Sequence, residues 1–273
     1  MTLLAALFAL GAMTLFGIAA VLQGIATARA QDVAVLDPRL LLHLARQPVF
    51  LVALILNGVG FLLHVAALQT LPLFLVQAVI AGSVAVTAVL SVRVLRTRLA
   101  PQQWGAVAMV VAGLVLLGVS AQSGEAESGP DALPLVLLGA VVGIAALAAA
   151  VRRLSYGAVL LGLLAGAGFG VVAIAARLLP ELGPGVLTSP FAGVLVLAGT
   201  GAFLVYSAAM QRGSVTTATA AMVVTQTVVP AAAGLLLGDR VRPGSVPVAL
   251  LGFALALAGA LGLGRFEQGL PVV

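Results

Sequence analysis

The feature that most constrains this chain is a series of long apolar segments that contain almost no charge. A helix needs about 20 apolar residues to cross the hydrocarbon core of a bilayer, and each segment has roughly that length. Nine such segments lie at residues 2–24, 50–68, 71–92, 104–120, 133–151, 157–179, 191–210, 215–237 and 247–263. They predict nine transmembrane helices.

The composition excludes a water-soluble fold. Apolar residues make up 62% of the 273 positions and charged residues only 8%, whereas soluble domains carry about 45–50% and about 25%. Strands of a membrane barrel would alternate in polarity every second residue, and these segments do not. Nine helices use roughly 180 positions, which leaves room for short connections but not for a soluble domain. The sequence therefore predicts a single all-α transmembrane domain over residues 1–273.

All 13 basic residues are arginines, against 8 acidic residues, and they lie mainly at the ends of the apolar segments. This placement is typical of membrane proteins, which carry excess positive charge on the cytoplasmic side. It does not indicate nucleic-acid binding, so the expected partner is the lipid bilayer. Ten arginines fall in the odd-numbered connections and the C-terminal tail: Arg29, Arg39, Arg46, Arg93, Arg96, Arg98, Arg152, Arg153, Arg212 and Arg265. The opposite side carries Arg177, Arg240 and Arg242, together with the acids Glu125, Glu127 and Asp131. The bias predicts a multi-pass protein of the cell membrane with its N-terminus outside and its C-terminus in the cytoplasm.

The first segment also invites comparison with a secretory signal, because Ala28-Arg29-Ala30 resembles a cleavage site. A signal has a basic N-terminal region and a shorter apolar core, whereas no basic residue precedes this segment, which runs for 23 residues. Cleavage would also leave the arginine-rich connections outside. We therefore expect this segment to be the first membrane helix.

An internal repeat is visible in the order of several short matches. Residues 61–69 (FLLHVAALQ) match residues 203–211 (FLVYSAAMQ) at an offset of 142, and residues 98–101 match residues 240–243 at the same offset. Phe16-Gly17 matches Phe169-Gly170 at an offset of 153. The longer connection after the first helix accounts for the difference. The shared order of the matches indicates a duplicated four-helix unit.

The duplication has a topological consequence. The first repeat covers residues 1–121, the second covers residues 157–264, and the helix at residues 133–151 stands between them. A single intervening helix makes the second repeat enter the membrane in the opposite direction, so the two repeats are inverted. Many secondary transporters have this architecture and bind substrate near the midplane between the halves. The sequence therefore predicts a transporter that works by alternating access.

Several short motifs resemble the drug/metabolite transporter superfamily of EamA-like proteins. The resemblance is carried by the helix ends Ala67-Leu68-Gln69 and Ala209-Met210-Gln211, and by residues 236–243 (LLGDRVRP) before a glycine-rich helix. Family members commonly have ten helices in two inverted halves. This chain departs from them because it lacks the first helix and has Thr97 and Asp239 where glutamate is common. Its nine helices and Val76-Gln77 are similar to the NIPA-type, magnesium-transporter-like branch. The resemblance implies solute transport, with Mg²⁺ as one possible substrate.

Polar side chains inside the segments are costly in lipid and therefore mark candidate sites. They gather in the second and third helices of each repeat, and the candidate substrate-binding residues are Asn57, His64, Gln77, Tyr206, Thr219 and Gln226. Tyr206 stands at the repeat position of His64. Neutral amides and hydroxyls in membrane helices also bond neighbouring helices, so structural roles are the alternative. Their concentration in both halves favours a shared polar cavity.

The residue types that are absent narrow the function. The chain has no cysteine and only two histidines, and no aspartate, glutamate or arginine lies near the middle of a segment. An enzyme would need a clustered acid–base set or metal ligands, so we predict no catalytic residues, no resident metal and no cofactor. Uncharged groups suit a small organic solute better than a bare ion. A NIPA-type Mg²⁺ transporter and a non-transporting structural or regulatory membrane subunit are the alternatives.

Glycines recur at helical spacing in three segments. Gly162, Gly166 and Gly170 lie in the sixth helix, Gly113 and Gly118 in the fourth, and Gly252 and Gly259 in the ninth. Small residues at such spacing let two helix backbones approach closely. We expect them to pack helices within the chain, and a homodimer through such a stripe is the alternative.

Overall fold

The computed structural model describes residues 2–28, 47–94, 100–122, 130–151, 157–180, 185–210 and 215–266, with a few side chains in these ranges excepted. Within these ranges the secondary structure is helical apart from one pair of two-residue strands. Its helices are α1 (Thr2–Ala28), α3 (Pro48–Leu68), α4 (Leu73–Ala81), α5 (Ser83–Val94), α6 (Pro101–Ser120), α7 (Leu133–Val151), α8 (Gly157–Arg177), α9 (Gly185–Thr188), α10 (Pro190–Met210), α11 (Val215–Leu236) and α12 (Val246–Phe266). The expected all-α fold is confirmed.

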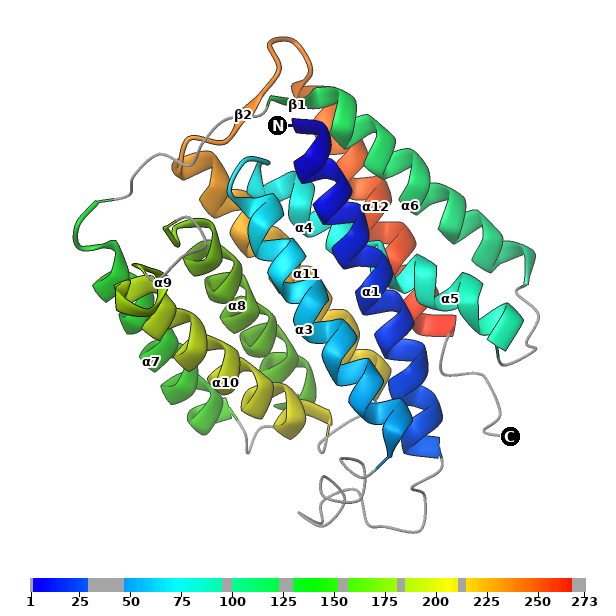
Figure 1. Ribbon diagram of the computed structural model, residues 1–273, viewed down its shortest axis with the longest axis horizontal. Coiled ribbons are helices and arrows are strands. Elements are labelled where there is room, and N and C mark those ends of the chain that lie inside the picture. Colours follow the sequence, from blue (N-terminus) through cyan, green and yellow to red (C-terminus); the bar gives the residue numbers. More distant parts are fainter. Residues whose placement is uncertain are drawn as a thin grey trace.

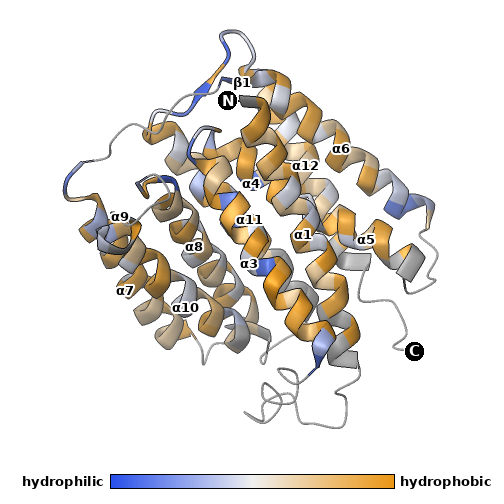
Figure 2. Cartoon of the chain, in the orientation of Figure 1, coloured by the Kyte–Doolittle hydropathy of each residue, from blue (hydrophilic) through white to orange (hydrophobic). Residues whose placement is uncertain are grey.

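Within the described residues, seven helical segments are long and apolar enough to cross a membrane. Residues 190–206 and 221–236 form two further apolar stretches that are shorter over the part searched. Large apolar side chains cover the outside of the helices, and among them Leu135 is 72% exposed and Val142 62% exposed. Figure 2 shows that the helices are predominantly apolar along their whole length. These surfaces are those of a multi-pass membrane protein, because water would not tolerate so much exposed apolar area.

The long helices run roughly alongside one another between two ends of the molecule (Figure 1). Strands β1 (Ala121–Gln122) and β2 (Arg240–Val241) pair antiparallel at one end, which we call the hairpin end. The helices α3, α6, α8 and α11 end there, and α1, α4, α7, α10 and α12 begin there (Figure 1). The strand pair joins the connection after α6 to the connection after α11. Two distant parts of the sequence are therefore fixed together at this end.

The segment expected at residues 71–92 is not one continuous helix. It consists of α4 and α5, which meet at Gly82. The amide of Gly82 donates to the carbonyl oxygens of Ala78 and Val79. A side chain at Gly82 would lie 2.9 Å from the Val79 carbonyl oxygen and 3.0 Å from Met13. The break therefore lies where α1 presses against this helix.

The helices pack in pairs. α1 packs against α3 and against α4 and α5, while α8 packs against α10 and α11. α6 packs along α12, and α4 packs against α11. α7 lies against α8 and α10. The molecule thus has one group built on α1 and another built on α8, joined through α6–α12 and α4–α11.

Glycine sets the distance between α6 and α12. A side chain at Gly113 would place its Cβ 2.5 Å from the backbone nitrogen of Ala256, so the two backbones are in direct contact. Gly252 and Gly259 lie equally close to the backbone of α6. Gly118, by contrast, has nothing within 4 Å and makes no close approach. The expected packing role therefore holds for three of these four glycines.

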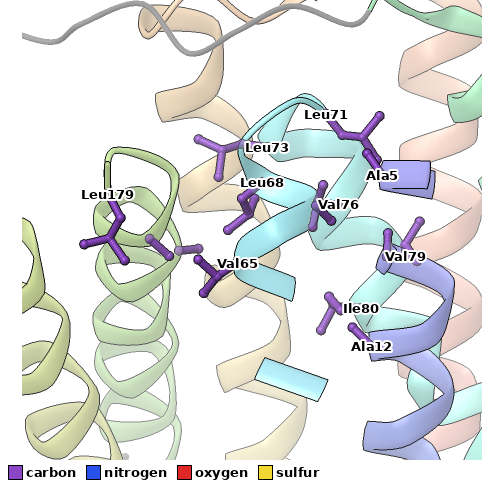
Figure 3. Packing of buried hydrophobic residues seen from close by; sticks show 14 residues of the cluster. Ala5, Ala12, Val65, Leu68, Leu71, Leu73, Val76, Val79, Ile80 and Leu179 are labelled. Atoms are coloured by element: carbon purple, nitrogen blue, oxygen red, sulfur yellow. The ribbon is translucent and has the colours of Figure 1, made fainter. Parts of the chain in front are cut away.

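A cluster of buried apolar side chains fills the hairpin end between α1, α3, α4 and α8. Figure 3 shows Leu68 and Leu73 on either side of the α3–α4 turn, with Leu179 beyond the end of α8. Leu68 and Leu73 have no exposed surface. This packing holds the end of α3, the start of α4 and the end of α8 together at the hairpin end of the molecule.

Candidate functional site

A cavity of about 410 Å³ lies between the group built on α1 and the group built on α8. Its lining comes from α1, α3 and α4 on one side and from α8, α10 and α11 on the other. The residues are Phe16, Phe61, His64, Gln77, Ile80, Phe169, Val172, Ala173, Leu195, Val196, Gly199, Thr200 and Gln226. No acidic or basic side chain other than His64 is among these described lining residues. The cavity is therefore largely apolar, with a few uncharged polar groups.

His64 and Gln77 form the polar centre of this cavity. The Nε2 atoms of the two side chains lie 3.3 Å apart, and both residues are buried, with Gln77 2% exposed. An amide nitrogen can only donate, so in this orientation of the amide His64 Nε2 accepts a hydrogen bond from the Gln77 side chain. An imidazole can accept only in its neutral form, which then carries its proton on Nδ1. The pair thus presents an uncharged hydrogen-bonding surface.

Phenylalanine rings hold the imidazole of His64 in place. The rings of Phe16 and Phe61 each lie 6.4 Å from the His64 ring, centroid to centroid, at 87° and 88°. Such edge-to-face arrangements are favourable because the ring edge is positive and the face negative. Phe169 adds a third aromatic ring to the lining. The cavity can therefore take an apolar or aromatic group beside a hydrogen-bonding group.

Two helices that border the cavity carry a local irregularity. α4 ends at Gly82, about one turn beyond Gln77, and the continuous helix α11 contains Pro230, one turn beyond Gln226. Proline removes one backbone hydrogen bond inside a helix.

The structure brings three of the six sequence-predicted site residues to one place. His64, Gln77 and Gln226 all line the cavity. Asn57 lies seven residues before His64 on α3 and is not part of the lining. Tyr206 is also outside it and packs in the cluster of Ala148, Leu161 and Ala209 between α7, α8 and α10. Thr219 lies in α11, but its side chain is outside the described ones.

Several lining residues are not among the sequence-predicted candidates, although the sequence carries one signal for them. Phe16 and Phe169, which match each other in the internal repeat, both face the cavity. Thr200 on α10 also lines it. The match between Phe16 and Phe169 therefore indicated two cavity-lining residues as well as a possible repeat.

A buried ion pair lies at the hairpin end, one turn from the cavity. Arg177 Nη2 is 2.8 Å from Asp239 Oδ1, and the two side chains are 2% and 0% exposed. Arg177 Nη1 also donates to the Leu68 carbonyl oxygen at 2.6 Å and to the Leu71 carbonyl oxygen. Charge counting places both residues on the same side of the membrane but does not predict that they pair or are buried.

Asp239 also binds the first turn of α4. Its Oδ2 accepts the backbone N–H of Leu73, and the backbone N–H of Phe74 donates to the same carboxylate. α4 follows Pro72, which offers no side-chain cap. A helix begins with unpaired N–H groups and a partial positive charge, which a carboxylate satisfies. We call Arg177, Asp239 and the backbone of Leu68, Leu71 and Leu73 the latch.

The electrostatics of the latch combine opposing effects on Asp239. Burial raises the pKa of its carboxyl group above the ordinary value of an aspartate. Arg177 and the backbone N–H groups of Leu73 and Phe74 limit that rise, because they stabilise the ionised form. The ionised form of the buried Asp239 carboxylate is thus stabilised by Arg177 and by the backbone N–H groups of α4.

Two glycines allow Asp239 to reach this position. Gly238 has φ of 88°, a left-handed conformation that turns the chain back after α11. A side chain at Gly234 would place its Cβ 2.2 Å from Asp239 Oδ2. The carboxylate therefore lies directly against the backbone of α11.

No protein-family model, curated protein or solved structure matches this chain. The geometry alone therefore carries the functional argument. It provides a cavity between two helix groups, suited to an uncharged or amphipathic solute, beneath an end held closed by a buried ion pair.

Proposed function

We propose that the chain is a secondary transporter that moves a small solute across the cell membrane by alternating access between two inverted four-helix repeats. The observation that carries this proposal is the cavity of about 410 Å³ with His64, Gln77 and Gln226 in its wall. Its lining comes from both repeats, and the helix ends lie against each other on one side of it. Inverted-repeat transporters hold their substrate near the membrane midplane, between their two halves.

The pattern of helix contacts supports the repeat. In the first half α1 packs against α3 and against α4 and α5, and in the second half α8 packs against the corresponding α10 and α11. α6 pairs with its counterpart α12, and α4 pairs with its counterpart α11. A two-fold axis in the membrane plane would map each of these contacts onto another contact or onto itself. α7 is then the unpaired helix between the halves.

Some contacts depart from this symmetry. At the hairpin end α3 packs against α8, where the side-chain amide of Gln69 donates to the Ala176 carbonyl oxygen at 3.1 Å. The repeat counterpart of this contact would join α10 to α1, and that pair is not among the main helix contacts of the described residues. α12 also packs against α4 and α5, whereas the counterpart pair of α6 with α11 is not among those contacts. Alternating access requires the two repeats to differ in this way at any moment, and to exchange their conformations during the cycle. The state described is closed at the hairpin end.

The cavity favours an organic solute over Mg²⁺. Magnesium takes oxygen ligands, usually including one or two carboxylates, and the described cavity lining contains none. No cluster of three or more His, Cys, Asp or Glu side chains suited to a metal occurs among the described residues. The carboxylate of Asp239, one helical turn beyond the cavity edge, already has both of its oxygens engaged in the latch. Loss of uptake in an Asp239 variant would therefore not identify a magnesium carrier, because the latch would fail for any substrate.

The proposed orientation follows from the arginine distribution. The helix ends that flank the ten-arginine connections lie at the end opposite the hairpin (Figure 1), and we assign that end to the cytoplasm. The N-terminus and the latch are then on the outer side. The latch would close the path from outside, and the solute would meet the cavity from the cytoplasm in this state.

The test is solute flux through purified protein in liposomes. A thermal-shift screen of neutral, amphipathic and carboxylate-bearing metabolites and of divalent cations first selects ligands, because a ligand that binds only the folded protein raises its melting temperature. Uptake of the selected solute is then measured with wild type and with Gln226→Ala. Saturable uptake that the variant reduces is the expected result. Mg²⁺ uptake that Gln226→Ala leaves intact would favour the magnesium carrier, and no flux of any ligand would favour a non-transporting subunit.

A further inference from the structure

We propose that Arg177 and the first turn of α4 form a binding site for a carboxylate, which Asp239 fills in this closed state and the carboxylate of a transported solute fills when the latch opens. Only the binding of a transported solute's carboxylate rests on the proposed transport function. The substrate class it names is a small amphipathic carboxylate. The site itself is defined by contacts that do not depend on transport.

The site has the donors that a carboxylate needs. Arg177 offers a planar guanidinium that is 2% exposed, with Nη2 2.8 Å from the bound oxygen. The backbone N–H groups of Leu73 and Phe74 point to the same carboxylate from the first turn of α4. Arginine matches the geometry of a carboxylate, and helix amino ends bind anions through their free N–H groups. Asp239 is thus an internal ligand of a complete anion site.

The site also has hydrogen-bonding capacity that Asp239 does not use. Arg177 Nε is buried and has no hydrogen-bond partner among the described residues. The hydroxyl oxygen of Thr70, in the α3–α4 turn, is also buried and also lacks a partner there. Buried polar atoms without partners are rare, because each costs free energy. The Arg177 guanidinium thus has a free donor for a ligand larger or differently placed than the Asp239 side chain.

The site is continuous with the cavity. Gln77 lies four residues after Leu73 on α4, and Ala173 lies four residues before Arg177 on α8, and both line the cavity. Four residues of helix rise about 6 Å. The near edge of the cavity is therefore one helical turn from the anion site, and a solute in the cavity can extend its carboxylate toward that site.

Exchange of ligands explains how the latch can open. A buried arginine without a counter-charge is strongly unfavourable, so Asp239 cannot simply leave. A solute carboxylate that takes its place keeps Arg177 and the N–H groups of α4 paired. Opening is then coupled to the presence of substrate, and an empty transporter stays closed at the hairpin end.

The test is rescue of a vacated site by added carboxylates. Asp239→Ala is purified at full length in detergent, and its melting temperature is measured with sodium acetate, sodium benzoate, acetamide, benzamide and inorganic phosphate. We expect both carboxylates to raise the melting temperature by several degrees and both amides to leave it unchanged. The double variant Arg177→Gln with Asp239→Ala should not respond. No response of Asp239→Ala, or an equal response of the double variant, would overturn the anion site, and phosphate acting better than acetate would overturn its assignment to carboxylates.

The continuity of the anion site with the cavity is tested by comparing benzoate with acetate. Benzoate should act at about a tenth of the acetate concentration, which corresponds to roughly 1.4 kcal/mol, because its ring can extend toward the edge of the cavity. Equal action of the two carboxylates would overturn the substrate class. Asp239→Ser serves if Asp239→Ala does not fold, since its short side chain vacates the carboxylate position and leaves Arg177 without a counter-charge. Rescue without any solute flux in liposomes would leave the anion site standing and reject transport.

Discussion

Asp239 caps a helix that begins 166 residues earlier in the chain, at Leu73. Pro72 ends the α3–α4 turn and has no side chain that can satisfy the free N–H groups of α4. The carboxylate that does so comes from the turn after α11, and Arg177 at the end of α8 balances its charge. One side chain therefore ties the turn between α11 and α12 to the start of α4. Any motion that separates α4 from α8 or from that turn at this end must break these contacts.

Removing one partner of the ion pair should destabilise the protein strongly. Arg177→Ala or Asp239→Ala leaves a buried, uncompensated charge, which costs about 3–5 kcal/mol. The double variant Arg177→Ala with Asp239→Ala should lose less than the sum of the two, since no charge is then left unpaired. Unfolding of the purified protein in detergent, followed by circular dichroism, measures all three.

The matched control for this cycle is Arg242→Ala. Arg242 lies near Asp239 in the sequence but is exposed, so its loss should change the free energy of unfolding by no more than about 0.5 kcal/mol. Additive losses in the double variant would mean that the two side chains stabilise the fold independently.

The sequence contained much of the helix arrangement but little of the latch. Apolar length located the membrane helices, because burial in lipid leaves no other way to satisfy the backbone. It could not show that Arg177 and Asp239 meet, because their 62-residue separation carries no periodic signal. The missing cap at Pro72 was a local sign that a distant carboxylate was needed.

Repeat matching also found candidate site residues, but only in part. His64 and Tyr206 occupy equivalent positions, yet His64 faces the cavity and Tyr206 packs against α7 and α8. The difference has a physical cause. α7 lies against α8 and α10 and has no counterpart beside α1 and α3, so the environments of the two equivalent helices differ. A sequence match cannot report a neighbour that only one copy has.

Changes to the cavity wall should impair transport without unfolding the protein. His64→Ala and Gln226→Ala each remove a polar group from the lining, and we expect up to a tenfold loss of uptake, about 1.4 kcal/mol. Gln77→Leu should act like His64→Ala because it breaks the same hydrogen bond. Uptake by reconstituted protein is measured beside the melting temperature.

Tyr206→Phe is the control for these variants, because Tyr206 lies in a helical segment of similar polarity but outside the cavity. Its uptake should stay within twofold of wild type. Normal uptake by both His64→Ala and Gln226→Ala would show that the solute binds elsewhere.

The contact of α6 with α12 should be intolerant of added volume. Gly113→Ala places a methyl group 2.5 Å from the Ala256 backbone nitrogen, and backbone atoms cannot move aside as a flexible side chain can. We expect a loss of about 1–3 kcal/mol, the usual cost of overpacking. Unfolding in detergent again provides the measurement.

The same helix supplies the comparison, since Gly118→Ala adds a methyl group where nothing lies within 4 Å. Alanine is the better helix former, so this variant should be stabilised by up to about 1 kcal/mol. Equal losses at the two positions would mean that glycine is needed in α6 for a reason other than its contact with α12.

Covalently joining α3 to α8 at the hairpin end should stop transport reversibly. The side chain of Gln69 bonds the Ala176 carbonyl oxygen, so Gln69→Cys and Ala176→Cys place two thiols near each other in a chain that has no other cysteine. A short thiol-reactive cross-linker should then join them in this state and hold the outer path closed. We expect uptake to fall to background after cross-linking and to return on cleavage of a disulfide-containing linker. Each single variant treated in the same way should keep its activity. Full uptake by the cross-linked protein would mean that α3 and α8 stay together throughout the cycle, and the hairpin end would then not be a gate.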